Sequence, residues 1–399
     1  MMKEKLAILG ASYLQRPLVE KAREMGVETH VFAWREGCVV EDIADHFYPV
    51  SILDQEEILR ICEKIQVAGI TSIGSDIAMP TVSYVAEKLG LKANSTHATR
   101  ISTDKYEMRK ALSAAGIKCP GFQQVEMGSG IREISFGFPM MVKPVDRSGS
   151  LAVTKVKNQQ ELGQAIEKAG KVSLSDRVIV EEFVEGREFS VEMISYEGKH
   201  HPITITDKIT SGDPYYVELE QHQPAALDEV TAGRINDLVI KTLDALELKN
   251  GASHTEVLLT KEGELVVVEA AGRMGGDFIG SHMVPLSTGY DFLKAVIEVA
   301  LDRFSGIEPS QFKMAHSGVF YVLPNPGVIK KIVDHSQRFE HVRLAVPILK
   351  VGDRVDEIVD GSGKRAGIVL YAHPSQRLFL NPGKVLVFET ERLSKQEGD

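Results

Sequence analysis

Cysteine is scarce in this sequence, with three among 399 residues. Cys38, Cys62 and Cys119 lie far apart and show neither a paired spacing nor the short spacing of cysteine metal ligands. The pattern disfavours a disulfide-stabilised secreted domain and a cysteine metal site. We expect reduced structural thiols in a cytoplasmic protein.

Long apolar runs and an excess of positive charge are also missing. No stretch reaches the roughly 18 apolar residues that a membrane-spanning helix needs. The start, from Met1 to Lys5, leads into a short apolar run without a signal-peptide core. The formal net charge of -10 disfavours a general binder of nucleic acid or of membrane surfaces. We therefore expect neither of these as a partner.

What is present near the start is an alternation of strands and helices. The chain is long enough for two or three domains. The loop at Gly10 has one of the three glycines of a dinucleotide fingerprint, which disfavours a dinucleotide cofactor. Gly10-Ala11-Ser12 and Ser75-Asp76 follow strands, where such sheets bind ligands, and are candidate substrate contacts. A doubly wound α/β domain is predicted from strands at Leu6–Leu9, Thr29–Phe32 and Ile70–Ile73 and helices at 17–25 and 56–65.

A predicted hairpin over His254–Arg273 carries an acidic pair. Two apolar runs flank a turn centred on Glu262-Gly263. With this turn Glu256 lies opposite Glu269, and His254 lies opposite Ala271. Strand alternation places Arg273 on the same face as these residues.

The opposed carboxylates repel each other. With Cβ atoms about 5 Å apart and an effective dielectric of about 20, the repulsion is roughly 3 kcal/mol. A divalent cation would compensate, and magnesium commonly uses one or two protein carboxylates together with substrate phosphates. The alternative is a pair of solvated glutamates on an edge strand.

Two lysines lie where a bound anion would favour them. Lys105 begins a predicted helix, where the dipole disfavours a cation, although a surface lysine is the alternative. Lys143 follows a strand at Phe138–Val142 and precedes a Ser-Gly-Ser loop at 148–150, before a strand at Leu151–Val156. Backbone N–H groups in such a loop can hold phosphate. A further loop is expected at Asp207–Gly212, where Lys208 either reaches a phosphate or is solvated.

A second strand end, at Val178–Val184, offers backbone groups beside an apolar wall, which suits an adenine edge. Glu188 follows a few residues later, where a carboxylate suits ribose hydroxyls. The alternative is a hairpin with exposed acids.

As a set, these motifs resemble the ATP-grasp superfamily. Their order and spacing are similar to those of biotin carboxylase, carbamoyl phosphate synthetase and the carboxylate-amine ligases. Gly251–Glu256 and Tyr216–Pro224 resemble the L-amino-acid ligase subgroup. The resemblance covers roughly residues 1 to 300 and rests on Lys105, Val142-Lys143-Pro144, Ser148-Gly149-Ser150, Glu181–Val184, Glu185-Gly186-Arg187-Glu188, Glu256 and Glu269.

The resemblance implies a fold that combines α/β and α+β parts. It places an N-terminal doubly wound α/β domain at residues 1–95 and an ATP-grasp domain at 96–310, with a lid subdomain at about 115–190 and a central sheet. A small β-rich C-terminal region would occupy residues 311–399.

It also implies roles for the matched residues. Glu256 and Glu269 would ligate Mg²⁺, or Mn²⁺ in its place, and Arg273 would face the acyl phosphate or the substrate carboxylate. The implied ATP contacts are Lys105, Lys143, Ser148, Gly149, Ser150, Glu181, Glu182, Phe183, Val184 and Glu188.

One position departs from the superfamily pattern Glu-x-Asn-x-Arg. Ala271 replaces the usual Asn ligand between Glu269 and Arg273, which leaves open whether one or two metal ions bind. We hypothesise that the ring of His254 occupies the space of the missing amide and orders a metal-bound water or the substrate. The alternative is a hydrogen-bonded histidine without a catalytic part.

The function that follows is an ATP-dependent carboxylate-amine ligase. It would form an amide or peptide bond through an acyl phosphate and release ADP and phosphate. Its partners would be small-molecule carboxylate and amine substrates, and a homodimer is compatible with the resemblance. The alternatives are a purine-pathway phosphoribosyl ligase, a bicarbonate-activating ATP-grasp enzyme, or a catalytically weak ATP-binding regulator, the last motivated by Ala271.

Overall fold

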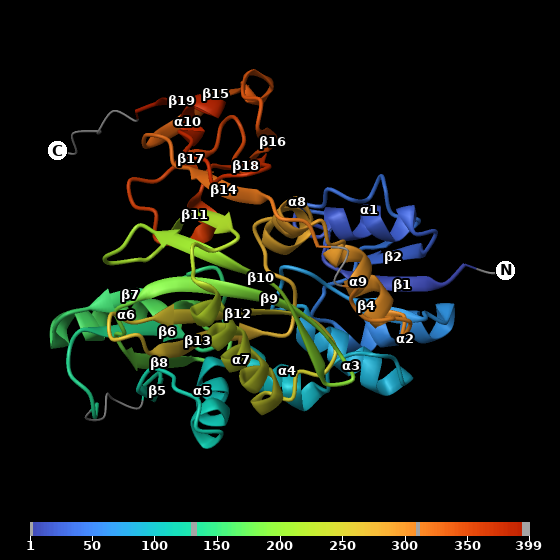
Figure 1. The fold of residues 1–399 in the computed structure, drawn as a ribbon, viewed down its shortest axis with the longest axis horizontal. Helices are drawn as coiled ribbons and strands as arrows, with labels where there is room; N and C mark the ends of the chain where they lie inside the picture. The colour runs from blue at the N-terminus through green and yellow to red at the C-terminus, as the bar shows by residue number, and fades with distance from the viewer. Residues whose placement is uncertain (1–2, 129–133, 309–311, 393–399) are drawn as a thin grey trace. The chain divides into compact units, whose positions relative to one another are not determined.

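The computed structural model describes residues 3–128, 134–308 and 312–392 (Figure 1). The chain divides into two compact units. Unit 1 consists of Met1–Pro120, Val184–Ile205 and Ala225–Lys313, and unit 2 consists of Gly121–Phe183, Thr206–Pro224 and Met314–Asp399. Within the described ranges, no helix is both long and apolar enough to cross a lipid bilayer.

Unit 1 begins with a parallel sheet in the order β3-β2-β1-β4. Leu6 and Ile8 of β1 point into one apolar core and Ala7 and Leu9 into another, as strand alternation requires. Helices therefore cover both faces, which confirms the predicted doubly wound arrangement and the mixed α/β class. The elements are β1 (Lys5–Leu9), α1 (Arg16–Glu24), β2 (Glu28–Phe32), β3 (His46–Tyr48), α2 (Gln55–Ile65), β4 (Gly69–Thr71), α3 (Met79–Leu89) and α9 (Phe292–Ala300).

The strands of the acidic hairpin also belong to unit 1. Strands β13 (Leu265–Ala271), β12 (Gly251–Leu259) and β9 (Arg187–Tyr196) are antiparallel neighbours in that order. Phe189, Val191 and Met193 of β9 pack into a core with the helices on one face. Glu192 alternates with them and so faces the other side. The helices of this part of the unit are α4 (Thr96–Thr103), α5 (Lys105–Ala114), α7 (Glu229–Ala245), η1 (Ile279–Met283) and α8 (Val284–Thr288).

The hairpin contains a β-bulge between the carboxylates and the tip. Glu256 pairs with Glu269 and His254 with Ala271, which confirms the predicted pairing. Beyond the bulge the register shifts, so that Leu259 pairs with Leu265. The prediction of one register out to the tip was wrong, because an extra residue on one strand interrupts the ladder.

Unit 2 contains an antiparallel sheet in the order β5-β8-β6-β7. Its apolar face packs against a helix through residues such as Val142, Leu162 and Val180. The strand predicted at Leu151–Val156 is shorter, because Ser150 and Ala152 have left-handed backbone conformations that an extended strand excludes. The elements are β5 (Phe122–Glu126), β6 (Met140–Pro144), β7 (Thr154–Val156), α6 (Gln159–Val172) and β8 (Arg177–Glu182).

Strand β10 (Lys199–Thr210) begins in unit 1 and ends in unit 2. Its last residues pair with β11, so the loop predicted at Asp207–Gly212 was wrong for Asp207 to Thr210. Lys208 is consequently buried. The other strands of unit 2 are β11 (Glu218–Gln223), β14 (His316–Val322), β15 (Gly327–Asp334), β16 (Val342–Pro347), β17 (Arg354–Val355), β18 (Gly367–His373) and β19 (Leu386–Glu391), with short helices η3 (Ser336–Arg338), η4 (Ser362–Lys364) and α10 (Pro382–Val385).

The domain boundaries expected from the sequence remain predictions. Residues 129–133 of the expected lid, 309–311 at the expected boundary to the C-terminal region, and 393–399 of that region lie outside the described residues.

Candidate active site

The opposed carboxylates of Glu256 and Glu269 lie at the centre of the candidate site in unit 1. They occupy paired positions on β12 and β13. Their side chains are 19% and 22% exposed, so both are partly accessible to a cation. The arrangement supplies two hard oxygen ligands.

Lys105 is buried rather than a surface lysine. Its Nζ lies 3.2 Å from Oε2 of Glu269. The preceding Asp104 caps α5 by accepting hydrogen bonds from the N–H groups of Tyr106 and Glu107. The carboxylate of Glu269 thus stabilises the ammonium of Lys105, which the helix dipole disfavours at this position.

His254 is buried between two carboxylates. Its Nδ1 hydrogen-bonds Oε1 of Glu192, and its Nε2 lies 3.6 Å from Oε1 of Glu256. Burial alone would lower the pKa of His254, but the charge and hydrogen bond of Glu192, together with Glu256, raise it to about 9. The ring is therefore an imidazolium at neutral pH.

Glycine at position 275 lets the chain pass close to this pair. The N–H of Gly275 donates to Oε2 of Glu192 at 3.0 Å. A Cβ at this position would lie 2.7 Å from Oε1 of Glu192 and 2.9 Å from Nδ1 of His254. Only a residue without a side chain fits.

Arg273 is held by a residue from the parallel sheet. Its Nε and an Nη donate to the two carboxylate oxygens of Asp76 at 2.8 and 2.7 Å. Burial would lower the pKa of Arg273, but the carboxylate of Asp76 raises it above its ordinary value. Asp76 follows β4 at the carboxyl end of the sheet, where the sequence predicted substrate contacts.

In unit 2, Lys143 on β6 reaches Glu181 on β8. Its Nζ lies 2.7 Å from Oε2 of Glu181, and both side chains are buried. The register pairs Met141 with Glu181, so Lys143 lies two residues further along the same face. The pair is a buried cation and acid on neighbouring strands.

The loop from Ser148 to Ser150 follows β6. Gly149 and Ser150 have φ values of +69° and +54°, and such turns can present successive N–H groups to one side. Asp146 fixes the base of the loop by accepting from the N–H of Leu174 at 3.1 Å.

Of the remaining residues expected to contact ATP, some belong to unit 2 and others to unit 1. In unit 2, Glu182 is exposed and accepts from the N–H of Gly121 at 3.3 Å. The N–H of Phe183 donates to the carbonyl of Pro139, and Lys155 lies over its ring, 3.8 Å from the centroid. Val184 and Glu188 belong to unit 1 and are half-buried, with Glu188 paired to Leu258.

Sequence reasoning missed Glu192. It is fully buried on β9 opposite His254 and contacts both His254 and Gly275. The sequence does contain an indication of Glu192, because a carboxylate inside an apolar strand is expected to be buried and therefore needs hydrogen-bond or charged partners. Lys155, which lies over Phe183, was also missed and has no such signal in the sequence.

Comparison with known proteins identifies the domain that holds most of these residues. Residues 136–281 match a family model described as an ATP-grasp domain. This segment of the chain is an ATP-grasp domain. The resemblance found in the sequence is thereby confirmed.

Two curated relatives of this chain are ligases. It is 27% identical over 256 residues to the alanine-anticapsin ligase of Bacillus subtilis, covering 58% of this chain and 52% of the relative. It is 27% identical over 205 residues to the D-alanine-D-alanine ligase of Lacticaseibacillus casei, covering 48% and 56%. The chain thus spans about half the length of the curated relatives it matches.

Solved structures share the fold over almost the whole chain. The L-amino acid ligase from Bacillus licheniformis superposes with a TM-score of 0.81 at 24% identity, covering 94% of both chains. The phosphoribosylglycinamide synthetase from Anaerococcus prevotii superposes with a TM-score of 0.75 at 18% identity, covering 98% of this chain and all of the other. At these identities the likeness shows a common fold.

Proposed function

We propose that this chain is an ADP-forming ligase that joins a small-molecule carboxylate to an amine. The observation that carries the proposal is the pairing of Glu256 with Glu269 next to the buried ammonium of Lys105. Two acids and a cation at one place suit a metal-bound polyphosphate, and both acids lie in the segment that matches an ATP-grasp domain.

The proposed reaction has two steps. A carboxylate oxygen of the first substrate attacks the γ-phosphorus of ATP, the bond to the ADP oxygen breaks, and an acyl phosphate forms. The amine then attacks the acyl carbon, phosphate leaves, and the amine loses a proton. Phosphoryl transfer needs mainly positioning and neutralisation of charge. Lys105, Lys143 and Arg273 are the proposed cations for this purpose.

Glu256 and Glu269 fit a magnesium ion. They are opposed, partly accessible and acidic, and Mg²⁺ takes one or two carboxylates when phosphates supply further oxygens. Such an ion would neutralise phosphate charge. Ala271 offers no ligand atom in its side chain, so these side chains support one ion.

His254 is best assigned a positioning role. One ring nitrogen hydrogen-bonds Glu192 on β9, and the other lies 3.6 Å from Glu256. The imidazolium therefore holds the carboxylate of Glu256 in place. This supports an indirect effect on the metal in place of the water-ordering role hypothesised from the sequence.

The proposed substrate anion would be received by Arg273. The planar guanidinium already binds one carboxylate, that of Asp76, through two parallel hydrogen bonds. This pair supports recognition of a second anion, the substrate carboxylate or the acyl phosphate, by the same cation.

A test combines ADP release with chemical trapping. The protein is supplied with ATP, Mg²⁺ and a panel of amino acids and other carboxylates, with hydroxylamine as the amine. We expect ADP and a hydroxamate in equal amounts with at least one acid. Glu269→Gln should remove both products, whereas Glu262→Gln at the exposed hairpin tip should retain them.

Other outcomes distinguish the alternatives. ADP release that requires bicarbonate or a phosphoribosylamine, without any hydroxamate from an amino acid, favours those ATP-grasp activities. ATP binding with no ADP release for any acid favours a regulator and contradicts the ligase proposal.

A further inference from the structure

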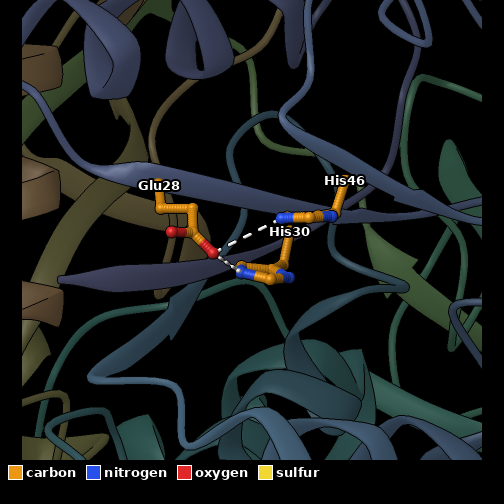
Figure 2. A group of neighbouring side chains, drawn as sticks. All are labelled: Glu28, His30 and His46. Carbon is orange, nitrogen blue, oxygen red and sulfur yellow. Dashed lines mark hydrogen bonds and ion pairs between the residues drawn. The ribbon is translucent and has the colours of Figure 1, made fainter. Parts of the chain in front are cut away.

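A second group of ligand-type side chains lies on the parallel sheet of unit 1. Glu28 and His30 come from β2 and His46 from β3 (Figure 2). His30 and His46 are direct register partners, and Glu28 precedes His30 by two residues, so the three share one face. One ligand atom from each lies within 4.8 Å of the others.

The group lies apart from the candidate active site. Glu28 is the first residue of β2, at the amino end of the parallel strands. Asp76, which holds Arg273, follows the carboxyl end of β4 in the same sheet. Because the strands are parallel, the amino ends and the carboxyl ends lie on opposite sides of the sheet.

The spacing of the atoms matches a metal centre. Oε1 of Glu28 lies 3.0 Å from Nε2 of His30 and 3.4 Å from Nε2 of His46. Ligands about 2.0 to 2.1 Å from a tetrahedral ion are separated from each other by roughly 3.3 Å. Figure 2 shows both imidazole Nε2 atoms directed at the same carboxylate oxygen.

The buried histidine has the surroundings of a metal ligand. The other nitrogen of His30, Nδ1, lies 3.1 Å from the hydroxyl oxygen of Tyr48. When Nε2 ligates an ion, the hydroxyl oxygen of Tyr48 can accept the Nδ1 proton and so fix the tautomer of the ring.

We propose that Glu28, His30 and His46 bind a divalent transition-metal ion of the zinc class. Two imidazoles and one carboxylate suit Zn²⁺, Co²⁺ or Ni²⁺, whereas Mg²⁺ prefers oxygen ligands. The side chain of His46 is 51% exposed, so water completes the coordination from the solvent side. The two imidazole rings are stacked, with an interplanar angle of 15°.

The ion would add a further link between two neighbouring strands. β3 has three residues and lies at the edge of the sheet, paired only with β2 in that sheet. Ligands from both strands would hold β3 in register, and this role does not depend on the ligase proposal.

The test measures Zn²⁺ and Co²⁺ binding to the whole chain by titration calorimetry in excess Mg²⁺. We expect one ion per chain and a visible Co²⁺ absorption typical of nitrogen ligation. His46→Ala and Glu28→Gln should each weaken binding at least tenfold, a loss seen when ligand shells are disturbed. His97→Ala, an exposed histidine on α4 that lies 3.9 Å from Glu247, is the matched control and should bind as the unaltered chain does.

Two results of the titration would overturn the site. One is Zn²⁺ binding that is unchanged in both ligand variants. The other is binding that Mg²⁺ displaces or that Glu269→Gln removes, which would place the ion at the carboxylates of the hairpin. X-ray absorption of the bound Zn²⁺ must also show imidazole ligands, and an all-oxygen shell contradicts the proposal.

Discussion

At the residue scale, each cation of the candidate active site in unit 1 contacts a carboxylate. Lys105 lies against Glu269, His254 hydrogen-bonds Glu192, and Arg273 forms two hydrogen bonds with Asp76. All six are buried or partly buried, so removing one partner leaves a charge with little water. Neutral isosteres are therefore cleaner probes than alanine.

The two substitutions of Glu269 should behave differently. Glu269→Gln retains the size of the side chain and removes one proposed metal ligand, so ADP release should fall at least a hundredfold with little change in stability. Glu269→Ala also leaves Lys105 without this partner and should lower the free energy of unfolding by roughly 1 to 3 kcal/mol. Steady-state kinetics and urea unfolding measure the two effects. Normal turnover in Glu269→Gln would refute the metal assignment.

His254 should make stability depend on pH. Its pKa is about 9 in the folded chain against an ordinary value of 6.5. The stabilisation is fully present below pH 6.5 and is lost as the pH rises through 9. Between pH 6 and pH 10 the unaltered chain should lose on the order of 3 kcal/mol more than His254→Gln. Urea unfolding across this range measures the difference, and a constant difference would contradict the imidazolium.

At the element scale, the β12–β13 hairpin places Glu256 opposite Glu269, and the loop after it contacts Glu192. The pairing of Glu256 with Glu269 was predictable, because turn position and strand alternation fix which residues face each other. The bulge was not predictable, since nothing in a Val-Val-Val run marks an extra residue. The partners of Lys105 and Arg273 were also hidden, because they depend on contacts between segments far apart in the sequence.

Gly275→Ala should disturb the site without touching a charged residue. Its Cβ would lie within 3 Å of Glu192 and His254, so the loop must move away from β9. We expect a loss of about 1 to 3 kcal/mol in unfolding free energy and a fall in kcat. Gly233→Ala on α7, where the added Cβ would meet nothing within 4 Å and φ is not positive, is the control for adding a methyl group without crowding. Equal kcat in Gly275→Ala and the unaltered chain would show that this close approach is not needed.

At the scale of the whole molecule, the expected ATP contacts belong to both units. Lys105 and Glu188 lie in unit 1, while Lys143 and Glu181 lie in unit 2. The sequence predicted this set through resemblance to a family, and the ATP-grasp comparison supports the resemblance. The choice of acid and amine was beyond prediction, because it depends on pocket shape and not on these shared motifs.

ATP should stabilise the chain, and we expect Lys143 to contribute to this effect. At a concentration of 100 times its Kd, a ligand adds about 2.7 kcal/mol to the free energy of unfolding. Lys143→Met should lose most of the rise in Tm caused by ATP with Mg²⁺, while it retains the rise caused by adenosine. Thermal unfolding with each ligand measures this. Equal losses for ATP and adenosine would show that Lys143 does not contact phosphate.

The bulge in the β12–β13 hairpin separates the tip from the paired glutamates. Residues 257–259 and 265–267 form their own short ladder beyond it, so a change in tip length can be accommodated there. The tip is therefore a practical place to insert a short epitope or a fluorescent label after Gly263. A labelled enzyme of this kind can be attached to a surface while Glu256 and Glu269 keep facing each other.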